Sequence, residues 1–183
     1  MYITLFCPLL LLPLLLLFNY TNSVFCEQES ILIDPMERFN LTYPLNWKMK
    51  YENNHNILLI PPSDTSYNNT YFKISRILQY NHSLNDHVFR HINNYISKYL
   101  LGDFISFRIN NIDSNFSIFR FPAYKLEFDV VMNDNFQSPV SFIEYFTIYD
   151  NQLFKFRFSQ DGQIKTMDKK IIESIIKSIK FNS

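Results

Sequence analysis

The sequence predicts an α+β fold in which an antiparallel β-sheet is flanked by helices and preceded by an N-terminal hydrophobic segment. Three observations predict it: short runs that alternate apolar and polar residues, two stretches whose apolar residues recur every three or four positions, and an uncharged, leucine-rich run at residues 3–18. Aromatic residues make up 17% of the chain and there are only two glycines, which favours a dense, strand-rich core.

Residues 1–26 are predicted to be a signal peptide or a membrane anchor. The apolar run is shorter than the roughly 20 residues of a membrane-spanning helix, and Pro8 and Pro13 weaken it as a span. No Lys or Arg precedes the run, which departs from the usual signal peptide. We expect an extracytoplasmic protein, secreted or anchored to the outer face of the cytoplasmic membrane, that meets the membrane only through this segment.

Covalent modification is the next expectation. Cys26 is a candidate lipidation site at the end of the leader, although the preceding Phe25 is not small; the alternatives are ordinary cleavage nearby and an uncleaved anchor. Because the other cysteine is Cys7, the mature domain has no internal disulfide. Five N-x-Ser/Thr sequons are possible glycosylation sites. One, at Asn19, lies in the leader, and the candidate sites beyond the leader are Asn40, Asn68, Asn81 and Asn115.

Beyond the leader, residues 27–37 are predicted to be a polar tether that ends in Asp34-Pro35, and residues 38–183 a single domain. Seventeen acidic residues balance seventeen basic ones, so the charge pattern gives no footprint for nucleic acid. We expect a monomer.

Alternating runs locate the strands of this domain. They fall at residues 39–43, 47–51, 57–60, 71–78, 105–109, 116–121, 124–132, 141–149 and 153–158. Residues 142–149 are apolar on both faces, as expected of a central strand, and Asp150-Asn151 is predicted to form a tight turn to the next strand.

Two amphipathic helices are predicted. The first spans residues 84–101, with Ser83 as N-cap and Gly102 at its end. Its expected core-facing stripe is Val88, Ile92, Tyr95, Ile96, Tyr99 and Leu100. Its expected polar, solvated side is His87, His91, Asn94 and Lys98. The second helix spans residues 167–179 and is opened by Thr166 or Asp168.

Two strings of the sequence resemble those of a known family. FNLTYPLNWKM resembles the aromatic strand, Tyr-Pro turn and Trp that begin PsbP domains, and EYFTIYDNQLFKFRFSQDGQIKTMDKKIIESIIKSIKF resembles their closing hairpin and terminal helix. The resemblance spans about residues 38–181. It implies the PsbP-like α/β/α sandwich found in photosystem II extrinsic subunits and in related exported prokaryotic proteins. Tyr43, Pro44 and Trp47 carry over as scaffold residues only.

The sharpest chemical pattern is His87 and His91, which lie four apart on a helix and can share a divalent metal, with His82 or Asp86 as a further ligand. A solvated His pair is the alternative interpretation. The zinc-protease motif is excluded because Val88 follows the first His where that motif has Glu.

Other catalytic patterns are weaker. Glu127 and Asp129 suggest general acid/base chemistry, but a spacing of two on a strand places both on one face, most simply the solvent face. The only two glycines are Gly102 and Gly162, so no G-x-S-x-G turn exists.

We therefore expect an exported, non-catalytic interaction or ligand-binding module without a cofactor, whose partner is a protein or a small ligand. The alternatives are a divalent metal-binding protein that uses His87 and His91, and a hydrolase whose residues assemble only in three dimensions.

Overall fold

The computed structural model describes residues 28–53, 56–62, 70–133 and 138–182. The leader, which includes Asn19 and Cys26, lies outside these residues, and so does Asn68. The strands are β1 (Glu29–Ile33), β2 (Phe39–Pro44), β3 (Lys48–Asn53), β4 (Asn56–Ile60), β5 (Tyr71–Ile77), β6 (Phe104–Ile118), β7 (Phe121–Met132), β8 (Pro139–Tyr149), β9 (Gln152–Asp161) and β10 (Lys180–Phe181). The helices are α2 (Leu84–Leu100) and α3 (Thr166–Ser178).

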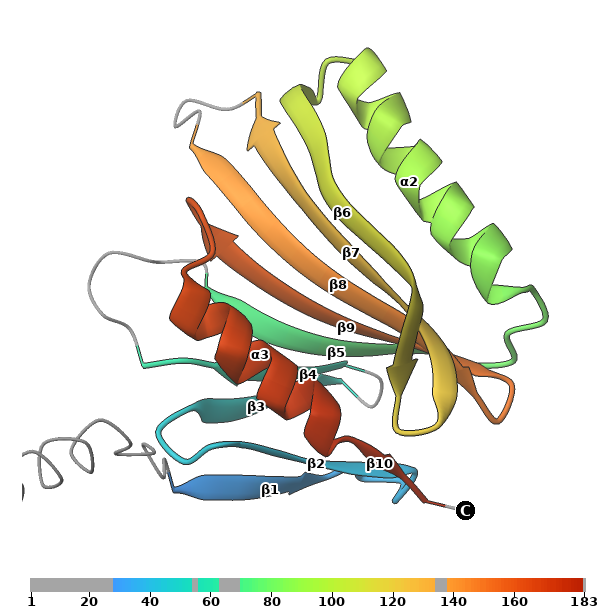
Figure 1. Cartoon of the computed structure of the whole chain (residues 1–183), viewed down its shortest axis with the longest axis vertical. Coiled ribbons are helices and arrows are strands. Elements are labelled where there is room, and N and C mark those ends of the chain that lie inside the picture. The colour runs from blue at the N-terminus through green and yellow to red at the C-terminus, as the bar shows by residue number, and fades with distance from the viewer. Residues whose placement is uncertain (1–27, 54–55, 63–69, 134–137, 183) are drawn as a thin grey trace, which may run out of the picture.

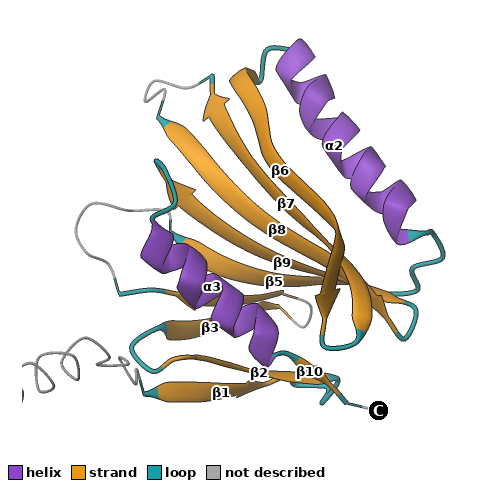
Figure 2. Ribbon diagram, in the orientation of Figure 1, coloured by secondary structure: helices purple, strands orange, loops and turns teal. Residues whose placement is uncertain are grey.

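The described strands form a seven-stranded sheet of order β3-β4-β5-β9-β8-β7-β6 and a three-stranded sheet of order β1-β2-β10. All of their pairings are antiparallel. Helix α2 lies on one face of the large sheet, and α3 with the small sheet lies on the other (Figures 1 and 2). The predicted α+β fold, an antiparallel sheet between helices, is thus confirmed.

The expected central strand and its turn are also confirmed. Residues 141–147 of β8 are all buried, because side chains on both faces of this strand are covered. Asp150 and Asn151 connect β8 to β9 with φ values of 48° and 53°. Two successive positive φ values define a type I′ turn, for which Asp and Asn are among the favoured residues.

The core on the α3 face joins the two sheets. Phe39 of β2 lies at its centre and makes edge-to-face contacts with Phe154, Phe156 and Phe181, with ring centroids 5.8, 6.4 and 6.4 Å away. The apolar side of α3, including Ile172 and Ile176, is buried against the same cluster. Aromatic rings therefore hold the small sheet to the large one.

The ends of α2 follow the predicted signals. The Ser83 hydroxyl accepts a hydrogen bond from the Asp86 N–H at 3.1 Å. At the other end, the N–H of Gly102, at φ 84°, donates to the Tyr99 carbonyl, and the Asp103 N–H donates to the Lys98 carbonyl. These two bonds form a Schellman motif, which needs the left-handed conformation that Gly102 supplies.

The predicted rotation of α2 is right for one half of the expected stripe and wrong for the other. Val88 is buried, and Ile92 and Tyr95 pack against the same core. The last part of the stripe is exposed: Ile96, Tyr99 and Leu100. His87 and His91, expected on the solvated side, face the sheet and pack against Phe146, with ring centroids 5.4 and 5.0 Å from it. The reason is a buried carboxylate on β8, described below, that draws polar side chains of α2 inward.

Two further boundaries differ from expectation. Residues 29–33, expected within a polar tether, form β1, which pairs along its whole length with β2 and buries Leu32. Helix α3 begins at Thr166, but its N-cap is Lys165, whose side chain makes no capping bond, while Asp168 lies in the first turn. In the described part of the chain, no helix is both long and apolar enough to cross a membrane.

The two edges of the large sheet are irregular or charged. β6 pairs only with β7 in the large sheet, and its register shifts between Phe104 and Ser106, between Ile109 and Asn111, and between Asp113 and Phe116. β3, at the other edge, is exposed along its length and carries Lys48 and Lys50.

We expect Phe39→Ala to destabilise the protein by about 3–5 kcal/mol, because it empties the aromatic centre between the two sheets. Phe89→Ala is the matched control, since Phe89 is 67% exposed on α2 and should change stability by no more than about 0.5 kcal/mol. Urea unfolding of the two variants measures the difference. Equal losses would contradict the placement of Phe39.

Candidate functional site

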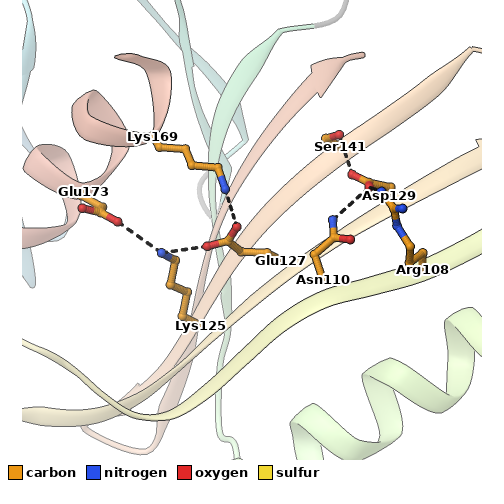
Figure 3. A network of polar contacts seen from close by, with 8 residues as sticks. All are labelled: Arg108, Asn110, Lys125, Glu127, Asp129, Ser141, Lys169 and Glu173. Carbon is orange, nitrogen blue, oxygen red and sulfur yellow. Dashed lines mark hydrogen bonds and ion pairs between the residues drawn. The ribbon is translucent and has the colours of Figure 1, made fainter. Parts of the chain in front are cut away.

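A polar cleft opens on the α3 face of the large sheet, between strands β6 to β8 and the start of α3. We call it the α3 cleft; its volume is about 240 Å³. It is lined by Arg108, Asn110, Glu127, Asp129, Ser141, Phe142, Gln163, Ile164 and Lys169. Figure 3 shows that its polar side chains form two clusters, one around each carboxylate of β7.

Two lysines hold Glu127. Lys169 of α3 donates to Glu127 Oε2 at 2.7 Å, and Lys125 lies 2.9 Å from Oε1 and also bonds Glu173 of α3 (Figure 3). Burial alone would raise the pKa of Glu127, but the hydrogen bonds and charges of the two lysines outweigh it and lower the pKa. Glu127 is therefore ionised at neutral pH and ties α3 to the sheet.

Asp129 has three donors. Ser141 Oγ, Asn110 Nδ2 and Arg108 Nη2 lie 2.6, 2.9 and 2.8 Å from its carboxylate oxygens (Figure 3). These bonds outweigh the effect of burial and lower the pKa of Asp129 as well. The Arg108 side chain is 71% exposed, so it borders the open side of the cleft.

The carboxylate pair shares one face of β7, as predicted, but that face is not the solvent face. Only 14% of the Glu127 side chain and 18% of the Asp129 side chain are exposed. Because both pKa values are lowered, neither carboxyl group holds a proton near neutral pH. The pair therefore does not divide the roles of general acid and general base.

The cleft also lacks an activated nucleophile among the described residues. The Ser141 hydroxyl donates a hydrogen bond to the Asp129 carboxylate, and a nucleophilic serine needs a base such as imidazole in reach. The described histidines, His82, His87 and His91, lie on α2 or just before it, and the two on the helix face the opposite side of the sheet. Among the described residues, Ser141 therefore has no imidazole in reach.

A second polar cluster lies under α2, around the fully buried Glu144 of β8. His91 Nε2 lies 2.5 Å from Oε2, and Arg157 Nε of β9 donates to Oε1 at 2.5 Å. Arg157 also donates to the Tyr95 hydroxyl at 2.8 Å. Burial alone would raise the pKa of Glu144, but the His91 bond and the charges of Arg157 and Lys155 lower it to about 2.

The predicted metal ligands do not converge. His91 Nε2 is taken by Glu144, His87 Nδ1 lies 3.0 Å from the Tyr80 hydroxyl, and the two imidazole rings are stacked 6.1 Å apart. His82 and Asp86 are exposed. Across the described ranges, no three His, Cys, Asp or Glu side chains gather as a metal site would require.

The other predicted sites are dispersed. Tyr43 and Trp47 are buried in the core on the α3 face, and β2 ends at Pro44. Asn81 and Asn115 are exposed, whereas Asn40 is half-buried in the middle strand of the small sheet, with its amide bonded to Asn182 at 3.3 Å.

Sequence reasoning missed Ser141, Asn110 and Lys169 in the α3 cleft, because these residues come from three separate elements and share no motif. It also missed Glu144, for which a signal existed. A lone Glu in the apolar run of residues 142–149 is a buried charge that must find a partner.

No protein-family model matches the sequence, and no curated protein is similar to it. The structure is similar to solved ones. Mog1p, a Ran-binding protein of Saccharomyces cerevisiae, superposes with a TM-score of 0.61 at 5% identity, over 85% of this chain and 96% of that one. CyanoP, the PsbP of the cyanobacterium Synechocystis sp. PCC 6803, gives a TM-score of 0.58 at 14% identity, over 87% of this chain and 96% of that one.

The chain has the PsbP-like fold. A protein of Bacteroides thetaiotaomicron is also similar, with a TM-score of 0.57 and 14% identity over 85% of this chain. This chain spans 49% of that protein's length. These superpositions show the fold alone, because a fold does not determine what its clefts bind.

Acidification through the titration range of His87 should destabilise the protein. Burial, followed by the charges of His91, Lys155 and Arg90, lowers its pKa from 6.5 to about 4. Between these pH values the unfolded chain binds more protons than the folded one, so stability falls as the pH drops from 6.5 to 4, by about 1–3 kcal/mol.

Urea unfolding at pH 7.5, 5.5 and 4.5 measures this loss. His87→Gln should flatten the dependence in this window, whereas His82→Gln, at an exposed position, should keep it. The Glu144 contribution is lost only at lower pH, as the pH falls from 4.5 to about 2. An unchanged slope in His87→Gln would contradict the assignment.

Proposed function

We propose that the protein is an extracytoplasmic, non-catalytic module that binds a small, hydroxyl-rich ligand in the α3 cleft. The observation that carries this proposal is the lining of the cleft, in which hydrogen-bond donors surround two fixed carboxylates and the charges cancel. The extracytoplasmic location rests on the apolar leader at residues 3–18.

The charge balance selects the ligand class. Glu127 and Asp129 oppose Lys169 and Arg108 along the lining, so the cleft has no net charge to attract an anion or a cation. Carboxylates only accept hydrogen bonds, and Arg and Lys only donate them. A hydroxyl group does both. A ligand with several hydroxyls can therefore donate to the carboxylates and accept from the Arg and Lys side chains at the same time.

The size of the cleft limits the ligand. A volume of about 240 Å³ corresponds to roughly eight water molecules, which is room for a compact ligand such as one sugar or cyclitol ring. The lining is mostly polar, with only Phe142 and Ile164 as apolar members, which fits a hydrophilic ligand better than a drug-like one. One protein of similar structure, Mog1p, is named for binding Ran, so the fold is compatible with a binding role.

Isothermal titration of the full-length protein with glucose, N-acetylglucosamine and myo-inositol tests the proposal. We expect at least one of them to bind, and Asn110→Ala to weaken that binding by about fivefold to tenfold through the loss of one hydrogen bond. Asn94→Ala, on the exposed side of α2, is the matched control and should bind normally. Absence of binding by all three ligands, or equal binding by both variants, would sink the proposal.

A further inference from the structure

The face of the large sheet that carries α2 has an uncovered half. Helix α2 packs against β6, β7 and β8, and in the described part of the chain the same face of β3, β4 and β5 carries no helix (Figure 1). On this half, residues of β3, β4 and β5 are exposed or half-buried. Its side chains therefore meet whatever approaches the sheet from that side.

Strand register identifies these side chains. Lys50 of β3 pairs with Leu58, Leu58 with Lys73, Lys73 with Arg157, and Arg157 with Glu144. Directly paired residues of neighbouring strands point to the same face. The row thus runs from the sheet edge to the Glu144 cluster under α2, and three of its five members are basic.

Two further lysines extend this row by the two-residue period of the strands, Lys48 on β3 and Lys155 on β9. We call the set Lys48, Lys50, Lys73, Lys155 and Arg157 the basic face. The carboxylates that lie among them are Glu52, 2.6 Å from Lys73, and Glu144, which Arg157 and His91 already hold. A chain whose charges cancel overall therefore concentrates positive charge here.

Lys155 shows that this charge is incompletely compensated. Its side chain is 26% exposed, and its ammonium lies 4.0 Å from Glu144, whose oxygens accept shorter bonds from Arg157 and His91. Burial lowers the pKa of Lys155; the Glu144 charge opposes this effect, and the charges of Arg157 and Lys73 add to it, so that the pKa stays below its usual value. A carboxylate arriving from outside would relieve this repulsion.

We propose that the basic face binds an acidic polypeptide segment of a partner protein, whose carboxylates pair with Lys50, Lys73 and Lys155. This surface is separate from the α3 cleft, which lies on the other face of the sheet. The apolar residues among the lysines favour a polypeptide over a bare polyanion, because half-buried Leu58 and Ile60 offer contacts that a nucleic acid or a lipid headgroup layer does not use.

The spacing of the strands sets the length of the segment. Lys50 and Arg157 are three strand spacings apart, about 14 Å at roughly 4.8 Å per spacing. An extended peptide crosses that distance in about four or five residues. A segment with two or three acidic residues separated by apolar ones therefore matches the row.

Fluorescence anisotropy with a labelled peptide that contains the core Glu-Leu-Glu-Leu-Glu tests this proposal on the full-length protein. We expect saturable binding that weakens as salt rises. The triple variant K50Q/K73Q/K155Q should bind at least tenfold more weakly. The triple variant K170Q/K177Q/K180Q is the matched control, because it removes the same charge from exposed positions on and after α3 and should bind as the wild type does.

Three outcomes would overturn the proposal: no peptide binding, equal weakening in the two triple variants, or tight binding of phosphatidylglycerol vesicles or inorganic phosphate where the peptide does not bind. Urea unfolding of both triple variants shows whether they remain folded. If K50Q/K73Q/K155Q unfolds, the single variant K50Q, at the exposed edge of the sheet, replaces it. K50Q should still weaken peptide binding severalfold. Asn110→Ala should leave peptide binding unchanged, so failure here is distinguishable from failure of the α3-cleft proposal.

Discussion

A single buried carboxylate organises the α2 side of this protein. Glu144 lies in the central strand β8, fully removed from solvent, and an ion in that position costs several kcal/mol unless it is paired and hydrogen-bonded. Arg157 from the neighbouring strand and His91 from α2 meet that requirement. The pairing fixes how α2 is turned about its axis, because His91 can reach Glu144 only when its side of the helix faces the sheet.

This constraint has an effect on the surface of α2. With His87 and His91 turned inward, apolar side chains that the helix also carries, Phe89 and Leu100 among them, point outward. The two histidines thus occupy positions between α2 and the sheet that apolar side chains of the helix would otherwise fill. On the other side of the sheet, aromatic rings around Phe39 form the core, and one group of charged side chains lines the cleft beside the first turns of α3.

The fold could be predicted from the sequence to the extent that its signals are local. Ser83 and Gly102 mark the ends of α2, Asp150-Asn151 marks the β8–β9 turn, and the apolar run of β8 marks its central position. The inward placement of His91 could not be predicted, because it depends on a contact with Glu144, 53 residues away in sequence. The β1 strand was missed since its partner, β2, supplies the burial that makes so short a segment a strand.

The α3 cleft shows the same limit. The spacing of Glu127 and Asp129 predicts that they share a face, but their environment depends on Lys169 and Asn110, which lie 42 and 19 residues away in sequence from the carboxylates they bond. No short sequence motif contains the residues of such a site. They come together only when β6, β7, β8 and α3 are assembled in the fold. The comparison with CyanoP establishes the same architecture without locating that site.

The shifts in register along β6 have a consequence for how the protein behaves in concentrated solution. An open strand of 15 residues at the rim of a sheet is a template on which a second molecule can be added, and so on into a fibre. Each of the three shifts breaks the even ladder of free N–H and C=O groups, so an incoming strand loses alignment within a few residues. At the opposite rim, Lys48 and Lys50 repel a like copy. Edge-to-edge pairing of two large sheets is therefore disfavoured at both rims.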